Sequence, residues 1–116
     1  MIKITRALSI RQPDAELIIQ GKKKIEYRSI RTNIVGERVY IYASKQPAYS
    51  PEAWAKVKAL PGDLPSGVLI GTVIIKKCSD EQNYDGNYEW YLIKPERLPR
   101  NKKPKNAGQP VWFKPF

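Results

Sequence analysis

The sequence contains no histidine and a single cysteine, Cys78, among its 116 residues. Without histidine, the chain cannot build a Ser-His-Asp or Cys-His relay, or the paired histidines of some ribonucleases. One cysteine permits no internal disulfide, and together with the missing histidine it argues against a zinc or iron–sulfur site. We therefore expect no metal and no cofactor, and any catalysis would depend on Lys, Tyr, Ser, Thr, Asp or Glu.

Long apolar runs are also missing. No stretch approaches the roughly 20 apolar residues that a membrane-spanning helix needs, and residues 1–6 lack the apolar core of a signal peptide. A chain of this length is too short to bury two separate hydrophobic cores. We expect a single domain over residues 1–116 that is monomeric, cytoplasmic and without membrane contact.

What the sequence has in excess is positive charge. It contains 21 Lys and Arg and 11 Asp and Glu, a net charge of +10. Residues 1–50 carry +6, residues 51–91 carry −2 and residues 92–116 carry +6. Two basic ends that meet on one face would form the positive surface that a phosphate backbone requires. The alternatives are a charge that only keeps the protein soluble, and a basic surface that binds an acidic protein partner.

Hydrophobic alternation and β-branched side chains predict a mainly β protein, with strands over residues 5–11, 25–28, 38–43, 68–76, 88–93 and 111–113. Prolines open two predicted helices, over 13–20 and 51–60, and Gly21 suits the left-handed position that ends the first helix. Gly71 predicts a bend within the most apolar strand. The polar residues 97–108 are expected to form a long surface loop. The fold class is therefore α+β, mainly β: a small barrel of five or six strands with two short helices.

The segment 21–28, Gly-Lys-Lys-Lys-Ile-Glu-Tyr-Arg, carries the densest charge pattern. Glu26 and Arg28 share one face of the predicted strand. This arrangement can place the Glu26 carboxylate against a base edge while Arg28 and Lys23 hold a phosphate. The alternative is a surface salt bridge, which contributes little to stability.

Three motifs carry a resemblance to a known family: Leu-Ser-Ile-Arg-Gln-Pro at 8–13, Gly-Lys-Lys-x-Ile-Glu-x-Arg at 21–28, and Val-Tyr-Ile-Tyr-Ala-Ser-Lys at 39–45. Together they resemble the ASCH domain, a branch of the PUA-like superfamily, and the likeness extends over essentially the whole chain. The resemblance implies a PUA-like β-barrel with a cleft beside the first helix that binds RNA or modified nucleosides. It places in this cleft the polar residues Gln12, Lys23, Glu26, Arg28, Ser44 and Lys45.

Some ASCH relatives are enzymes, which leaves a hydrolase as the alternative function. In one branch, which resembles an acetylcytidine amidohydrolase, a threonine nucleophile pairs with the lysine that Lys23 matches, but Glu26 occupies the threonine position here. In an RNA-cleaving enzyme, Lys23 would need a lowered pKa to act as a base. If the protein is an enzyme, the catalytic residues expected are Lys23 and Glu26, in a metal-independent reaction on RNA or a modified nucleoside.

Further ligand contacts are predicted from residue type and position. Many ASCH relatives have a large aromatic residue after the Gln-Pro pair, and Asp14 stands there instead. Tyr40, Tyr42 or Trp90 would therefore supply the surface on which a base stacks. The basic segment 97–105 would follow a nucleic-acid backbone or remain a solvated loop. The remaining predicted contacts to RNA or a nucleotide are Arg11, Arg100, Lys102 and Lys103.

Overall fold

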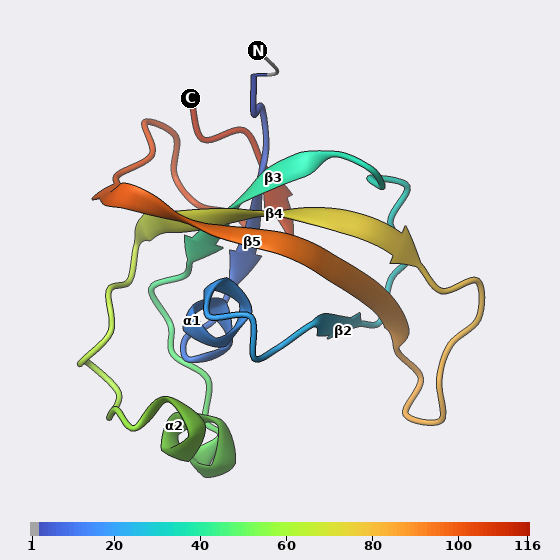
Figure 1. Ribbon diagram of the computed structural model, residues 1–116, viewed down its shortest axis with the longest axis horizontal. Helices are drawn as coiled ribbons and strands as arrows, with labels where there is room; N and C mark the ends of the chain where they lie inside the picture. The colour runs from blue at the N-terminus through green and yellow to red at the C-terminus, as the bar shows by residue number, and fades with distance from the viewer. Residues whose placement is uncertain (1–2) are drawn as a thin grey trace.

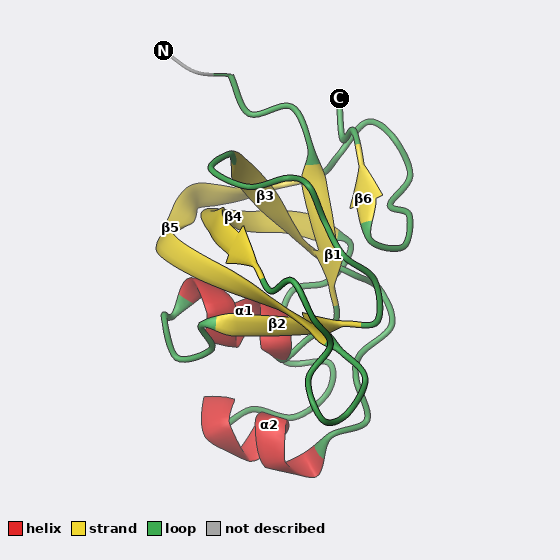
Figure 2. Ribbon diagram, turned by 90° about the vertical axis from the view of Figure 1, so that its right-hand side faces the viewer, coloured by secondary structure: helices red, strands yellow, loops and turns green. Residues whose placement is uncertain are grey.

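The computed structural model describes residues 3–116 and contains one curled sheet with two short helices (Figure 1, Figure 2). The six strands, in their order across the sheet, are β2 (Ile25–Arg28), β5 (Tyr88–Lys102), β4 (Val68–Cys78), β3 (Arg38–Ala43), β1 (Ala7–Ile10) and β6 (Trp112–Phe113). β1 and β3 run parallel, and the other neighbouring strands run antiparallel. The prediction of a mainly β fold of the small PUA-like barrel type, with two short helices, is confirmed.

The two helices are α1 (Asp14–Ile19) and α2 (Pro51–Val57). Gly21 follows α1 at a φ of 78°, the left-handed conformation predicted for it. α2 ends earlier than the predicted residue 60, because Lys58 adopts a left-handed conformation with a φ of 55° and breaks the helical hydrogen bonding. Within the described part of the chain, no helix has the length and apolar character to cross a membrane.

Gly71, in β4, allows α1 to pack closely against the sheet (Figure 1). A Cβ atom at this position would lie 2.5 Å from both the backbone oxygen of Glu96 and Cδ1 of Ile19. The pairing register of β4 with both neighbouring strands shifts beside Gly71. A shift of this kind marks a β-bulge, which bends a strand and increases its twist. The predicted bend at Gly71 is confirmed, and it curls the sheet around α1.

The main hydrophobic core lies between α1 and the side of the sheet that faces it. Its fully or almost fully buried members include Leu8, Ile10, Ala15, Ile18, Ile41, Ile70 and Trp90. A smaller cluster fills the other side of the sheet and consists of Ala7, Tyr42, Leu69 and Phe113. Each large apolar side chain buried in this way contributes about 1.5–3 kcal/mol. These two clusters hold α1 and the C-terminal β6 in place, and α1 and β6 both lie next to the site described below.

β5 departs most from the prediction, because it continues to Lys102 where a loop was expected from residue 97. Its second half pairs with β4, with Arg97 opposite Gly71 and Lys102 opposite Leu69. Its other edge pairs with β2 only over Tyr88–Tyr91. A strand with one free edge tolerates prolines and charges, so the composition that indicated a loop is compatible with an edge.

An ion pair fixes this second half of β5 to α1. Arg97 Nη1 and Nη2 donate to Glu16 Oε1 and Oε2 at 3.1 and 2.6 Å, a two-point contact. The Glu16 carboxylate raises the pKa of Arg97 by accepting these hydrogen bonds, although partial burial acts against the shift. Because this ion pair and the pairing with β4 fix the end of β5, the position at which the following segment begins is fixed as well.

Candidate functional site

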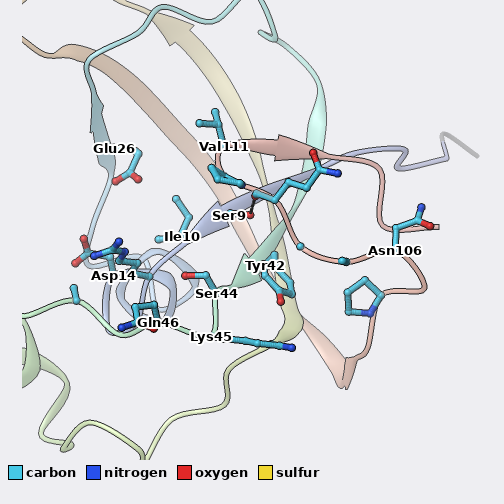
Figure 3. Close-up of a pocket in the computed structure, with 18 of the residues that line it drawn as sticks. Ser9, Ile10, Asp14, Glu26, Tyr42, Ser44, Lys45, Gln46, Asn106 and Val111 are labelled. Carbon is cyan, nitrogen blue, oxygen red and sulfur yellow. Dashed lines mark hydrogen bonds between the residues drawn. The ribbon is translucent and has the colours of Figure 1, made fainter.

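A pocket with many charged side chains in its lining opens where the parallel strands β1 and β3 end (Figure 3). The carboxyl ends of neighbouring parallel strands meet at one edge of a sheet, so the residues that follow them come together there. The pocket has a volume of about 870 Å³, within the range of small-molecule and cofactor sites. Its lining comes mainly from four segments, within residues 9–14, 23–28, 42–48 and 103–111.

On the β2 side of the pocket, charged side chains pair with one another. Glu26 and Arg28 share a face of β2, as predicted, and Arg28 Nε and Nη2 both lie 2.9 Å from Glu26 Oε2. Lys23 Nζ lies 3.2 Å from Glu26 Oε1 and 3.1 Å from Asp14 Oδ2. The Glu26 side chain is only 8% exposed, so the two cations compensate a largely buried carboxylate. We call Asp14, Lys23, Glu26 and Arg28 the charge-paired cluster.

Both cations of this cluster are held by further contacts. Arg28 Nη2 donates to the backbone oxygen of Ser9 at 2.7 Å, which connects β2 to β1. The Arg28 guanidinium lies 5.8 Å from the ring centroid of Trp90, and Lys23 Nζ lies 5.9 Å from that of Tyr27. These are cation–π distances. The pocket therefore presents cationic groups whose positions are already restricted before a ligand arrives.

The surroundings of Lys23 determine its protonation. Burial disfavours the ammonium form and by itself would lower the pKa of Lys23. The carboxylates of Glu26 and Asp14 attract the ammonium and accept its hydrogen bonds, and together they raise the pKa of Lys23 above its ordinary value. Lys23 is therefore protonated at neutral pH. A base at this position would need a lowered pKa, and the carboxylates of Glu26 and Asp14 shift the pKa of Lys23 in the opposite direction.

The rest of the pocket carries cations without carboxylate partners. Arg11 follows β1, Lys45 follows β3, and Lys103 and Lys105 follow β5. All four residues are exposed, and none of them forms an ion pair within residues 3–116. We call these four residues the free cations. Their charge remains available to an anionic ligand.

Residues 103–111 form one wall of the pocket, and hydrogen bonds fix this wall to β1. The hydroxyl of Ser9 donates to the backbone oxygen of Gln109. The backbone N–H of Ser9 donates to the backbone oxygen of Val111 at 2.8 Å. Because the wall is bonded to the sheet, Lys103 and Lys105 extend from an ordered segment.

Tyr42 lines the pocket beside this wall. It is only 5% exposed, and its ring meets that of Phe113 edge to face at a centroid distance of 5.1 Å. A Cβ atom at Gly108 would lie 2.5 Å from Cε2 of Tyr42, so the wall approaches this closely because position 108 is glycine. Tyr42 therefore supports the wall and has little free surface for the predicted stacking. Tyr27, which is 46% exposed, is the more accessible aromatic side chain of the pocket.

Most of the predicted site residues meet in this pocket, whose lining includes Arg11, Lys23, Glu26, Arg28, Tyr42, Ser44, Lys45 and Lys103. The motifs of the sequence therefore identified a set of residues that the fold brings together.

Among these residues, Ser44 has a buried hydroxyl oxygen that makes no hydrogen bond to any described residue. A buried hydroxyl without a partner is unusual in a folded protein.

Gln12 and Trp90 do not line the pocket, and both are buried. Gln12 donates from Nε2 to the backbone oxygen of Pro65 and accepts at Oε1 from the backbone N–H of Glu16, each at 3.0 Å. Trp90 is 0% exposed and stacks on Trp112 at a centroid distance of 5.9 Å. In the structure Gln12 holds α1 and Trp90 supports Arg28. The base contacts predicted for these two residues stay predictions, and the pocket lining adds no support to them.

Arg100 and Lys102 also lie outside the pocket lining. Both are exposed residues of β5, and Lys102 Nζ lies 4.8 Å from the ring centroid of Phe116. Because β5 keeps its pairing as far as Lys102, the basic stretch enters the pocket only from Lys103 onward. The predicted segment 97–105 is thus divided between the sheet and the pocket wall.

Some pocket residues were not predicted as site residues, among them Ser9, Tyr27 and the segment 106–111. Ser9 and Tyr27 lie inside the recognised motifs, where their alternation with buried neighbours was the available signal. The segment 106–111 gave no local signal, because its place depends on the bonds of Gln109 and Val111 to β1. Among residues 3–116, no group of three or more Cys, Asp or Glu side chains is placed to hold a metal ion.

Comparison with known proteins identifies a family. A family model for the ASCH domain matches residues 8–109, from β1 to the pocket wall. The chain is also 31% identical over 88 residues to Activating signal cointegrator 1 from Homo sapiens, in an alignment that covers 66% of this chain and 15% of that protein. The chain therefore corresponds to a small part of that relative. With the family match extending over most of its residues, the chain belongs to the ASCH domain family.

Proposed function

We propose that this chain binds RNA, or a nucleotide, in the pocket at the ends of β1 and β3. The observation that carries the proposal is the set of free cations around a pocket large enough for a nucleotide. The resemblance to ASCH domains implies the same ligand class. A chain of net charge +10 also attracts polyanions from a distance.

The distribution of ion pairs indicates where the ligand's phosphates lie. The sequence alone suggested Lys23 and Arg28 for this role, but both are paired with carboxylates. A phosphate beside them would also meet the negative charges of Glu26 and Asp14. We therefore assign the phosphates to the free cations and leave the charge-paired cluster for the neutral part of the ligand.

Binding is favoured over hydrolysis by the protonation of Lys23. With its pKa raised, this lysine cannot serve as a general base at neutral pH. The threonine nucleophile of the amidohydrolase branch is replaced by Glu26, whose carboxylate is engaged by Lys23 and Arg28. The pocket therefore has the groups for recognition and lacks an activated nucleophile or base at these two positions.

The experiment is a fluorescence-anisotropy titration of labelled single-stranded RNA against the wild type and a double variant, Lys45→Ala with Lys103→Ala. We expect the variant to bind about tenfold more weakly at moderate salt. For each lysine–phosphate interaction that the variant removes, the slope of log K against log salt should become shallower by about 0.7. The matched control is Lys56→Ala with Lys76→Ala, which has the same net charge and changes two exposed lysines outside the pocket lining.

Equal weakening by both double variants would mean that net charge, and not this pocket, attracts the RNA. Absence of wild-type binding at low salt, with a protein co-purifying and no excess absorbance at 260 nm, would point to an acidic protein partner. The titrated RNA is then resolved on a denaturing gel, and shortened RNA would favour the hydrolase alternative.

A further inference from the structure

The charge-paired cluster presents a specific order of hydrogen-bonding groups to the pocket. The carboxylate of Glu26 lies in the middle, with Lys23 on Oε1 and Arg28 on Oε2. A lysine ammonium and an arginine guanidinium only donate hydrogen bonds, whereas an ionised carboxylate only accepts them. Taken from Lys23 to Arg28, the order is donor, acceptor, donor.

Each of these groups keeps hydrogen-bonding capacity after the internal ion pairs are counted. Lys23 has three N–H donors and pairs with two carboxylates, Asp14 and Glu26. Arg28 uses Nε and Nη2, and its Nη1 makes no hydrogen bond to any residue in 3–116. Glu26 Oε1 is approached by Lys23 alone, which leaves one of its two acceptor sites free. A ligand can therefore contact all three groups without breaking the cluster.

The complement of donor, acceptor, donor is acceptor, donor, acceptor. Among the four RNA bases, uracil presents this order on its Watson–Crick edge, where the imide N3–H lies between the carbonyl oxygens O4 and O2. Cytosine presents a donor followed by two acceptors, and guanine presents an acceptor followed by two donors. Adenine has no third polar group on this edge. Proteins that recognise single-stranded RNA by sequence use this edge of unstacked bases.

We infer that the charge-paired cluster selects uracil-type imide edges, with Glu26 accepting from N3–H while Lys23 and Arg28 donate to the two carbonyls. The inference rests on the proposed function, and it assigns the base to the β2 side and the phosphate to the free cations. The cluster is suited to discrimination because Trp90, Tyr27 and Ser9 already restrict its cations. A base with the wrong order leaves a buried charged group without its hydrogen bond.

The first test changes only the ligand, so folding is not at issue. Labelled 12-nucleotide oligouridylate and oligocytidylate are titrated at the same salt concentration, and we expect oligouridylate to bind at least about tenfold more tightly. An oligonucleotide of N3-methyluridine, which lacks the imide donor, should lose this advantage. An oligonucleotide of 5-methyluridine adds a methyl group away from the imide edge and should keep it.

The second test changes the acceptor. Glu26→Gln keeps the shape of the side chain but offers an amide with both a donor and an acceptor. We expect the preference for oligouridylate over oligocytidylate to fall by about tenfold, with cytosine N3 now able to accept from the amide. Lys56→Ala serves as the control and should keep the wild-type preference. A thermal melt establishes that Glu26→Gln is folded, and the methylated ligands decide the question if it is not.

The outcomes separate this inference from the proposed function. Equal binding of oligouridylate and oligocytidylate, both weakened by Lys45→Ala with Lys103→Ala, would leave RNA binding in place and overturn the uracil preference. Undiminished binding of N3-methyluridine would also overturn it. Failure of every RNA to bind at low salt would overturn both proposals together.

Discussion

The charge-paired cluster and the free cations line the same pocket with similar side chains, but their surroundings differ. Lys23 and Arg28 lie within 3.2 Å of carboxylate oxygens and are largely enclosed. Lys45 and Lys103 are exposed and have no acidic partner within residues 3–116. The first pair is therefore committed to the protein, whereas the second pair remains free for a ligand.

The difference shows why a count of lysines and arginines does not locate a phosphate site. A cation that already compensates a buried carboxylate contributes little net potential outside the protein. An exposed cation beside a pocket contributes its full charge, subject to screening by salt. Charged residues of the first kind should chiefly affect folding and base preference, and those of the second kind should chiefly affect affinity and its salt dependence.

The largest expected effect separates buried from exposed ion pairs. Glu26→Ala leaves Lys23 and Arg28 enclosed without their shared carboxylate, and we expect it to reduce the free energy of unfolding by about 3 kcal/mol. Glu37→Ala is the matched control, because Glu37 pairs with Arg6 at 2.7 Å and both side chains are 37% exposed. That change should cost less than about 1 kcal/mol.

Urea denaturation followed by tryptophan fluorescence measures both variants. The signal is the summed emission of Trp54, Trp90 and Trp112, and it includes a fully buried tryptophan beside Arg28, so it follows global unfolding of both variants. Similar losses for Glu26→Ala and Glu37→Ala would mean that the cluster behaves as an ordinary surface ion pair.

An intermediate effect is expected at the wall that carries Lys103 and Lys105. Gly108→Ala places a methyl group against the ring of Tyr42, and crowding of this kind typically costs about 1–3 kcal/mol. The wall can relieve the contact by moving away from β1, which displaces the lysines as well. We therefore expect RNA affinity to fall together with stability, measured by anisotropy and a thermal melt.

Ala107→Ser changes the neighbouring exposed residue and should leave both quantities nearly unchanged. If Gly108→Ala lowers stability but not affinity, the position of the wall is unimportant for binding, and the free cations act only through their charge.

The smallest expected effect is that of pH on binding. Lys23 has a raised pKa in the folded protein and the chain has no histidine, so we expect RNA affinity to change less than about twofold between pH 6 and 9. A group whose pKa is higher in the folded than in the unfolded protein contributes its full stabilisation at pH values below its unfolded-state pKa. That stabilisation is lost as the pH rises through the folded value. Lys23 should therefore add to the loss of stability only in the alkaline range, above about pH 10.

The comparison with Lys23→Met isolates this contribution. The variant should lose less stability than the wild type between neutral and strongly alkaline pH, measured by urea denaturation at each pH. A titration of RNA affinity near pH 7 would contradict the prediction and indicate a group in the pocket whose pKa is shifted toward 7, either a lysine with a lowered pKa or a carboxyl group with a raised one.

Local signals in the sequence were sufficient for much of the fold and for the cluster. The strand pattern of residues 25–28 placed Glu26 and Arg28 on one face, and the structure pairs them. Proline at its start and Gly21 after its end located α1 within one or two residues. These features depend on neighbours in sequence, which is why they could be predicted.

The failures share a dependence on distant contacts. β5 was predicted to end near residue 93 because the following residues are charged and include two prolines, yet pairing with β4 extends the strand to Lys102. Trp90 was considered as a stacking surface, but it is fully buried and stacks on Trp112, which is 22 positions later in the chain. The pocket wall could not be predicted for the same reason, since Ser9 and Gln109 are one hundred positions apart.

The bonds from Ser9 to the wall also determine when the site can exist during synthesis. Domains generally fold as units, and a chain is synthesised from its N-terminus. A nascent chain that has emerged as far as β5 already contains Asp14, Lys23, Glu26 and Arg28, but not the wall that faces them. The proposed RNA site is therefore completed late, only after the segment through Val111 has been translated.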